Sequence, residues 1–257
     1  MSEDSNKTDI LNGDILKDEV LSCIKQLKNG SSCGIDNRVC NEMIKGNANI
    51  FAKPLVILFN RIFTSNRFPE EWTCNTITPI FKSGNINTPS NFRGIAVAGS
   101  LCKLFNKILA KRLEDYMSLN ELYSNNQLGF RKKLRTEDNV FILHSAINKY
   151  IYAKNRSRNS KLYISFVDFQ KFFDSINRNM LLYKLIKYGI TGKMYYIIKD
   201  MYTNCQYRVK NSNGVSKTII NSSIGLKQGD CTSPILSNIF QNDIHDIFNE
   251  KCDQIML

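Results

Sequence analysis

The stretch from Leu162 to Asp174 constrains the possible folds of this 257-residue chain more than any other. It begins as an apolar run, the pattern of a buried strand, and the run ends on a carboxylate, Asp168. Side chains of a strand alternate between its two faces, so Asp168 shares a face with Ile164 and Phe166. Because an unpaired charge is costly inside a core, we expect Asp168 at the end of the strand, facing solvent or a cation.

An aromatic pair and a helix signal follow this carboxylate. Phe172 and Phe173 lead to Asp174 and Ser175, which can cap a helix that ends near Gly189. A strand, a carboxylate, an aromatic pair and a helix in this order can hold a divalent cation beside a flat, selective pocket. The same residues also fit a plain strand with a solvated aspartate and a capped helix, so this stretch alone leaves both interpretations open.

Charge and cysteine content narrow the class of protein. The formal net charge is +12, and a globular chain this basic usually meets a polyanion, most often nucleic acid, although a solvated basic surface gives the same total. The eight cysteines form no C-x-x-C pair and there are two histidines, which argues against a zinc site. We expect reduced thiols in an intracellular protein, nuclear or cytoplasmic, with no membrane span.

Local patterns predict the remaining elements. Residues 1–14 are polar and are expected to be loose. Alternating residues predict strands over 76–81 and 92–97, and a hairpin whose strands, 206–210 and 215–220, flank Asn211 to Gly214. Apolar residues at helical spacing predict helices over 15–30, 50–66, 100–116, 136–151 and 192–203, and one capped by Ser233 with Pro234 in its first position.

Four motifs stand in a fixed order along the chain. They are a loop from Lys82 to Arg93 with its returning strand, the link Gln127-Leu128-Gly129-Phe130-Arg131, Asp168 with its aromatic pair, and Gln228-Gly229 before Ser233-Pro234. Together they resemble the reverse transcriptase domain of non-LTR (LINE-type) retrotransposons over about residues 15–250. The related reverse transcriptase of group II intron maturases is the second choice within this class.

The resemblance implies a role for three residues around the aspartate. Asp168 would be the first catalytic aspartate of the palm and a ligand of two Mg²⁺ ions. The backbone carbonyl of Phe169 would join a metal shell. Phe173 would pack under the sugar of the incoming nucleotide, whereas its spacing alone favours a core position. Asp174 is assigned to helix capping rather than to metal.

It also implies how the nucleotide would be held. Lys82 and Arg93 would bind the triphosphate, and Gln228 and Gly229 would touch the nucleotide and the template base. Gly94 stands where the family usually has proline, and Phe172 stands where a small residue is usual, which could crowd the nucleotide pocket.

The implied fold is α+β, with reverse-transcriptase fingers and an N-terminal extension over 15–160 and an incomplete palm, an antiparallel sheet packed on helices, over 161–257. The implied function is an RNA-directed DNA polymerase, a nucleotidyltransferase that adds dNTPs to a DNA primer on an RNA template by two-metal phosphoryl transfer. The palm hairpin with paired aspartates would follow at about residue 255. The chain holds no Asp-Asp pair, so we expect it to be incomplete and inactive alone.

Two rival functions remain. A non-catalytic remnant that binds nucleic acid would keep the basic surface and lose the chemistry. A basic structural protein with no nucleic-acid role fits the motif order less well. The missing carboxylate pair separates the polymerase from the remnant.

Overall fold

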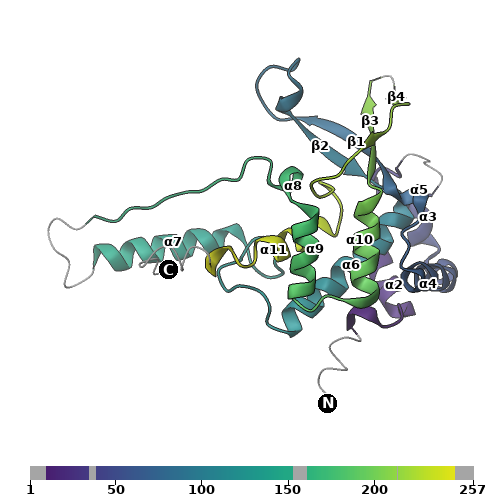
Figure 1. Cartoon of the computed structure of the whole chain (residues 1–257), viewed down its shortest axis with the longest axis horizontal. Coiled ribbons are helices and arrows are strands. Elements are labelled where there is room, and N and C mark those ends of the chain that lie inside the picture. Colours follow the sequence, from purple (N-terminus) through teal and green to yellow (C-terminus); the bar gives the residue numbers. More distant parts are fainter. Residues whose placement is uncertain (1–9, 35–38, 153–160, 213, 247–257) are drawn as a thin grey trace, which may run out of the picture.

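The computed structural model describes residues 10–34, 39–152, 161–212 and 214–246. Helices form a body, a small sheet rises from one end of it, and one helix projects from the other side as an arm (Figure 1). The longest described helix, α6 (Ser100–Leu119), runs through the body. Helices and strands together confirm the α+β class predicted from the sequence.

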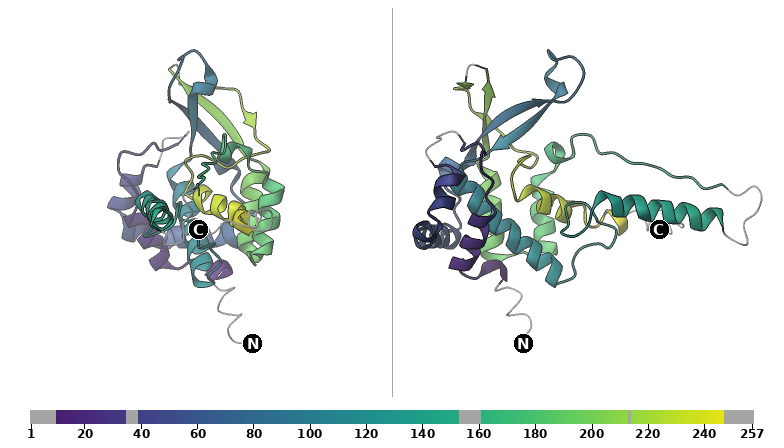
Figure 2. Two further views of the ribbon diagram at one scale, coloured as in Figure 1. Left: turned by 90° about the vertical axis from the view of Figure 1, so that its left-hand side faces the viewer. Right: turned by 180° about the vertical axis from the view of Figure 1, so that it is seen from behind.

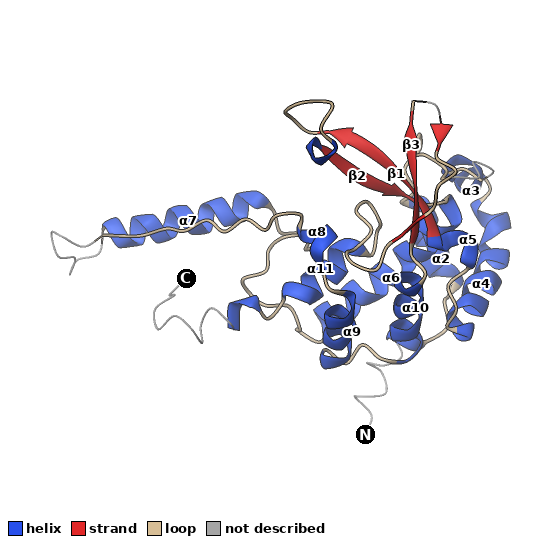
Figure 3. Ribbon diagram, turned by 45° about the horizontal axis from the view of Figure 1, so that its top comes forward, coloured by secondary structure: helices blue, strands red, loops and turns tan. Residues whose placement is uncertain are grey.

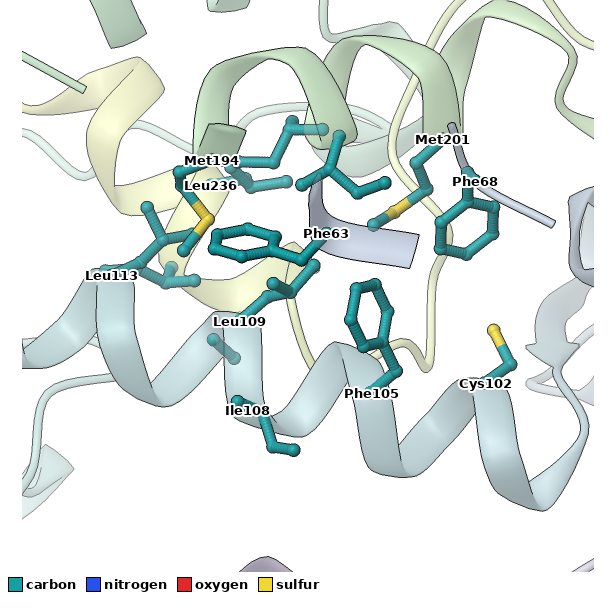
Figure 4. Close-up of a cluster of buried hydrophobic side chains, with 14 of the residues drawn as sticks. Phe63, Phe68, Cys102, Phe105, Ile108, Leu109, Leu113, Met194, Met201 and Leu236 are labelled. Atoms are coloured by element: carbon teal, nitrogen blue, oxygen red, sulfur yellow. The ribbon is translucent and has the colours of Figure 1, made fainter. Parts of the chain in front are cut away.

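The hydrophobic core surrounds α6, in which 12 of the 20 residues are buried. It packs against α2 (Lys17–Lys25) and α11 (Ser233–Gln241), while α4 (Ala48–Ser65) packs against α2 and α10 (Gly192–Thr203). The ring of Phe105 lies 5.3 Å from that of Phe59 and 5.9 Å from that of Trp72. Figure 4 shows Phe63, Met194 and Leu236 in this same cluster, although they come from three helices. Burial of these apolar groups is the main term that favours the folded state.

The sheet contains strands from both halves of the chain. Strand β1 (Cys74–Phe81) pairs with β2 (Phe92–Val97) in antiparallel register, with Phe81 opposite Phe92. It pairs on its other side with β3 (Gln206–Asn211), which also pairs with the short strands β4 (Gly214–Val215) and β5 (Ile220–Asn221). Figure 3 shows the strands in red above the helices.

One pairing corrects the predicted antiparallel sheet, because β1 and β3 run parallel, with Cys74 opposite Gln206. Parallel strands need a long crossover between them, and the helices between β2 and β3 provide it. Strand β3 falls in the range predicted for the palm, yet it belongs to the sheet of the predicted fingers.

Several helix boundaries differ from the predicted ones. Residues 10–12 are helical and Leu11 is fully buried, so residues 10–14 are not loose, and α2 ends at Lys25. Helix α9 (Arg178–Lys187) is capped by Asn177, whose Oδ1 accepts from the Met180 N–H at 3.0 Å, and not by Asp174. Thr232, not Ser233, precedes α11. Short helices α3 (Asn41–Gly46), α5 (Glu70–Thr73) and α8 (Phe172–Ser175) complete the body, with a 3-10 turn, η1, at Pro89–Asn91.

Helix α7 (Thr136–Ile151) and the extended segment 161–169 form the arm. The arm points away from the body (Figures 1 and 2), and none of the described side chains of α7 is buried. The side of α7 that the sequence marks as apolar is therefore present but does not pack on the described residues. Among these, no helix is both long and apolar enough to cross a membrane.

The prediction of a buried strand at 162–168 is wrong, because the structure has no strand there. This segment is extended but pairs with no described strand, and Tyr163 and Phe166 are 84% and 83% exposed. A strand is defined by ladder bonds to a neighbour, so the apolar pattern alone cannot form one. The basic run from Lys154 to Lys161 is expected from its composition to form a polar loop, and it lies outside the described residues apart from Lys161.

Candidate nucleotide-binding site

A glycine-containing turn, Gly225 to Asp230, lies between the sheet and helix α8. On one side, the N–H groups of Gly225 and Leu226 donate to the carbonyls of Ile176 and Phe173, at 2.9 and 2.8 Å. On the other side, the Ala96 N–H of β2 donates to the Gln228 carbonyl at 2.7 Å. The turn is therefore hydrogen-bonded both to the strand that carries Arg93 and to the helix that carries Phe173.

Two glycines permit this close approach. Gly229 has φ +104°, and a Cβ there would lie 2.9 Å from Cγ2 of Ile95. Gly225 has φ +80°, and its Cβ would lie 2.6 Å from the carbonyl oxygen of Asp174. Both the backbone angle and the lack of space exclude a larger residue at these positions.

The hairpin of β1 and β2 places the two predicted triphosphate ligands on one face. Arg93 is opposite Ile80 in the register, and Lys82 lies two residues beyond Ile80, so the two cationic side chains are diagonal neighbours. The Lys82 N–H donates to the Asn91 carbonyl at 2.9 Å, which continues the hairpin. Both cations are exposed and form no ion pair within the described residues.

Phe173 lies in a half-buried aromatic group beside the turn. Its ring contacts that of Phe172 at 5.8 Å and that of Phe130 at 6.0 Å, both edge-on. Phe130 belongs to the Gln-x-Gly-Phe-Arg link, whose Gly129 carbonyl accepts from Asn238 Nδ2 of α11 at 3.0 Å. Two of the sequence motifs therefore meet at Phe173, and helix α11 holds one of them in place.

Asp168 is not brought into contact with the other predicted site residues. It is exposed and forms no ion pair within the described residues, while the ring of its neighbour Phe169 lies 5.6 Å from that of Phe172. The described residues contain no group of three His, Cys, Asp or Glu side chains that could hold a metal ion. Asp168 is one carboxylate, and this donor set does not fit a two-metal site by itself.

Two residues that stabilise the turn had no signal in the sequence. The buried guanidinium of Arg178 donates to the carbonyls of Tyr202, Gly225 and Ile224, at 2.9, 2.8 and 3.0 Å, and to that of Ser222. Asp230 is 9% exposed and accepts three hydrogen bonds. Apart from the Thr232 hydroxyl, two residues from Asp230, the partners of these side chains are distant in sequence or are backbone atoms, so residue spacing does not reveal them.

Known proteins resemble the chain over most of its length. Residues 80–257 match the family model described as "Reverse transcriptase (RNA-dependent DNA polymerase)". A Drosophila melanogaster protein named "Probable RNA-directed DNA polymerase from transposon BS" is 29% identical over 88% of this chain and 24% of its own length. A Popillia japonica protein, "Retrovirus-related Pol polyprotein from type-1 retrotransposable element R2", is 30% identical over 68% of this chain and 24% of its own.

A third relative is the Saccharomyces cerevisiae "Putative COX1/OXI3 intron 2 protein", 26% identical over 98% of this chain and 26% of its own length. The chain spans about a quarter of the length of these relatives. The α+β fold is consistent with a domain of a nucleic-acid polymerase. The chain belongs to the reverse transcriptase family, and its relatives identify it as a reverse transcriptase domain of the non-LTR retrotransposon type.

Proposed function

We propose that this chain supplies the fingers and the first part of the palm of an RNA-directed DNA polymerase. The enzyme would add dNTPs to the 3′ end of a DNA primer on an RNA template, inside the cell. The observation that supports this most strongly is the turn at Gly225 to Asp230. It is hydrogen-bonded to β2 and to Phe173, so residues proposed for the triphosphate, the sugar and the template base share one framework.

The proposed ligands have the chemistry that a dNTP requires. The planar fork of Arg93 can give two parallel hydrogen bonds to phosphate, and Lys82 on the same face adds a point charge. The Phe173 ring would lie below C2′ of the sugar and leave no room for a 2′-hydroxyl, the group that distinguishes RNA precursors from DNA precursors. Gln228 and Gly229 would contact the nucleotide and the template base.

We propose Mg²⁺ as the metal, with Asp168 as one ligand and the Phe169 carbonyl near it. Bound in a pair, such ions would activate the primer hydroxyl and stabilise the leaving pyrophosphate. The described residues form no group of three His, Cys, Asp or Glu side chains that could hold an ion, so we expect at least one further ligand from outside them. The exposed position of Asp168 leaves its carboxylate accessible to an ion held in that way.

Primer extension tests the role of Asp168. The protein should be a longer one that contains this chain and continues past residue 257, assayed on an RNA template with Mg²⁺. Asp168→Asn is expected to lower the extension rate by more than about tenfold, with nucleic-acid affinity unchanged, because the lost interaction is with metal in the transition state. The matched control is Asp174→Asn, another exposed acid six residues away, which should keep full activity. Retention of activity by Asp168→Asn within about tenfold would remove Asp168 from the metal site.

A non-catalytic nucleic-acid-binding remnant is the alternative, favoured because Asp168 is the one carboxylate that the sequence motifs assign to the metal site. The 257-residue chain would then bind primer–template duplex with an affinity that falls steeply with salt, because phosphate contacts release counterions. It would extend no primer with Mg²⁺ or Mn²⁺, and neither would the longer protein. Extension by the longer protein alone supports the polymerase, and extension by the 257-residue chain would show that the described acids suffice.

A further inference from the structure

We propose that Asp230 is a positioning residue whose buried carboxylate holds the Gln228–Gly229 peptide against strand β2. This inference deepens the proposed polymerase function and rests on it for its effect on nucleotide binding. Asp230 itself would touch neither nucleotide nor metal. It would act through the turn, by fixing where the Gln228 carbonyl and the Gly229 backbone lie relative to the finger hairpin.

The carboxylate of Asp230 is fully engaged. Its Oδ1 accepts from Asn106 Nδ2 at 2.9 Å and from the Cys231 N–H at 2.8 Å, and its Oδ2 accepts from Thr232 Oγ1 at 2.6 Å. Cys231 and Thr232 are its neighbours, but Asn106 is on α6, 124 positions away in the sequence. Asp230 therefore connects the turn to α6, around which the described core is built.

Hydrogen bonds within the rest of the turn connect Asp230 to strand β2. The Asp230 N–H donates to the Lys227 carbonyl at 3.0 Å, and the Ser233 hydroxyl donates to the same carbonyl at 2.7 Å. These bonds close the turn, so that the Gln228 carbonyl accepts from the Ala96 N–H. The Lys227 side chain is also buried, with Nζ 5.4 Å from the Phe68 ring centroid and 5.8 Å from that of Tyr202. The turn thus carries two buried side chains, of which Asp230 makes the hydrogen bond to α6.

The contacts argue against a metal role for this acid. Both of its oxygens already accept hydrogen bonds, the side chain faces α6, and the residue is 9% exposed. Asparagine at this position would keep Oδ1 for Asn106 and Cys231, and the Thr232 hydroxyl can rotate to accept from its amide. Alanine would leave three donors without an acceptor, which is far more costly. The two substitutions therefore separate a positioning role from a charge or metal role.

The first measurement is amide hydrogen exchange in the 257-residue chain, which needs no activity. Asp230→Ala is expected to speed exchange of the Ala96 N–H by at least about tenfold, because the turn would detach locally. Exchange at Leu113, in the core of α6, should be unchanged. Gly229→Ala retains Asp230 but has no room for its Cβ, so it should speed Ala96 exchange as well. Asp230→Asn should leave exchange near that of the unchanged protein.

The second measurement is single-nucleotide extension by the longer protein, with KM for dNTP and kcat determined separately. Asp230→Ala and Gly229→Ala are expected to raise KM for dNTP by about tenfold, the scale of one or two lost hydrogen bonds, with a smaller change in kcat. Asp230→Asn should leave KM for dNTP close to the value of the unchanged protein. A matched destabilising control, Glu19→Gln, is remote from the turn and should leave KM unchanged.

Three outcomes would overturn the proposal. Equal losses of activity in Asp230→Asn and Asp230→Ala would indicate a charge or metal role. Unchanged Ala96 exchange in Asp230→Ala would show that the carboxylate does not hold the turn. Faster exchange with an unchanged KM would show that the turn does not position nucleotide. If the unchanged longer protein extended no primer, the polymerase function would fail, while the exchange result would still decide whether Asp230 holds the turn.

Discussion

The core around α6 and the arm formed by α7 and residues 161–169 have similar apolar patterns, but the apolar side chains are buried in the core and exposed in the arm. In the core, the rings of Phe59, Phe105 and Trp72 are packed against each other. In the arm, Phe141 is 71% exposed and the helix that carries it buries none of its described residues. An amphipathic pattern thus specifies which face of an element is to be covered, and only the tertiary structure specifies whether the cover is present.

The largest expected difference between the two regions comes from one substitution made in both. Phe105→Ala should lower the free energy of unfolding of the 257-residue chain by about 3–5 kcal/mol, because it opens a cavity in the aromatic cluster. Phe141→Ala should change it by less than about 0.5 kcal/mol, since nothing described packs on that ring. Urea unfolding of both variants checks this, and equal losses would mean that the arm is packed in solution.

An intermediate loss of unfolding free energy is expected when the ion pair that joins α2 to α6 is removed. The Glu19 carboxylate accepts from Arg112 Nε and Nη2 at 2.8 and 2.7 Å. Burial raises the pKa of Glu19, but the hydrogen bonds from Arg112 and from the Leu16 N–H, with the charge of Arg112, outweigh it, and the pKa is lowered. Glu19→Gln should therefore cost about 1–2 kcal/mol near neutral pH.

The sign of its pH dependence follows from the lowered pKa. The pair contributes its full stability above the unfolded-state pKa of 4.5, and that contribution is lost as pH falls through the lower folded-state pKa. The difference between Glu19→Gln and the unchanged chain should thus shrink below about pH 4.5. Asp18→Asn, which removes an exposed acid of the same helix, is the control for the loss of a carboxylate. A difference that stays constant from pH 7 to pH 3, as measured by chemical denaturation, would contradict the assignment.

The smallest change in stability is expected when an alanine is replaced by glycine in α7 or in α6. Ala146→Gly in α7 should weaken the arm helix by about 1 kcal/mol, visible as faster local amide exchange, with no change in the global unfolding midpoint. Ala110→Gly in α6 should lower the global midpoint, because that helix belongs to the core. A global shift caused by Ala146→Gly would mean that arm and core unfold together.

Local pattern was sufficient for elements whose signal lies within a few residues. The structure has the predicted 192–203 and 136–151 helices, and β2 runs from Phe92 to Val97 as expected. It was insufficient for the 162–168 strand, because ladder partners are not encoded in the strand itself. The parallel pairing of β1 with β3 also depends on residues more than a hundred positions apart.

In the candidate site, too, some residues were predictable from local sequence and others were not. The motif order marked Arg93, Phe173 and the Gln228–Gly229 turn, and the structure brings the turn to the elements that carry the other two. The supports of the turn were not predictable. Arg178 binds backbone carbonyls, which have no sequence signature, and Asp230 looks like any acid in a polar turn until Asn106 is placed beside it.

The parallel pairing of β1 with β3 has a consequence for the order of folding during synthesis. Strand β1 is complete at Phe81, but its neighbour Gln206 to Val209 leaves the ribosome more than a hundred residues later. Because non-local contacts form only after long loops close, the central strand of the sheet has one open edge through most of translation. Until the second half of the chain arrives, the hairpin of β1 and β2 therefore lacks the strand that covers this edge, which leaves it open to pairing with other chains.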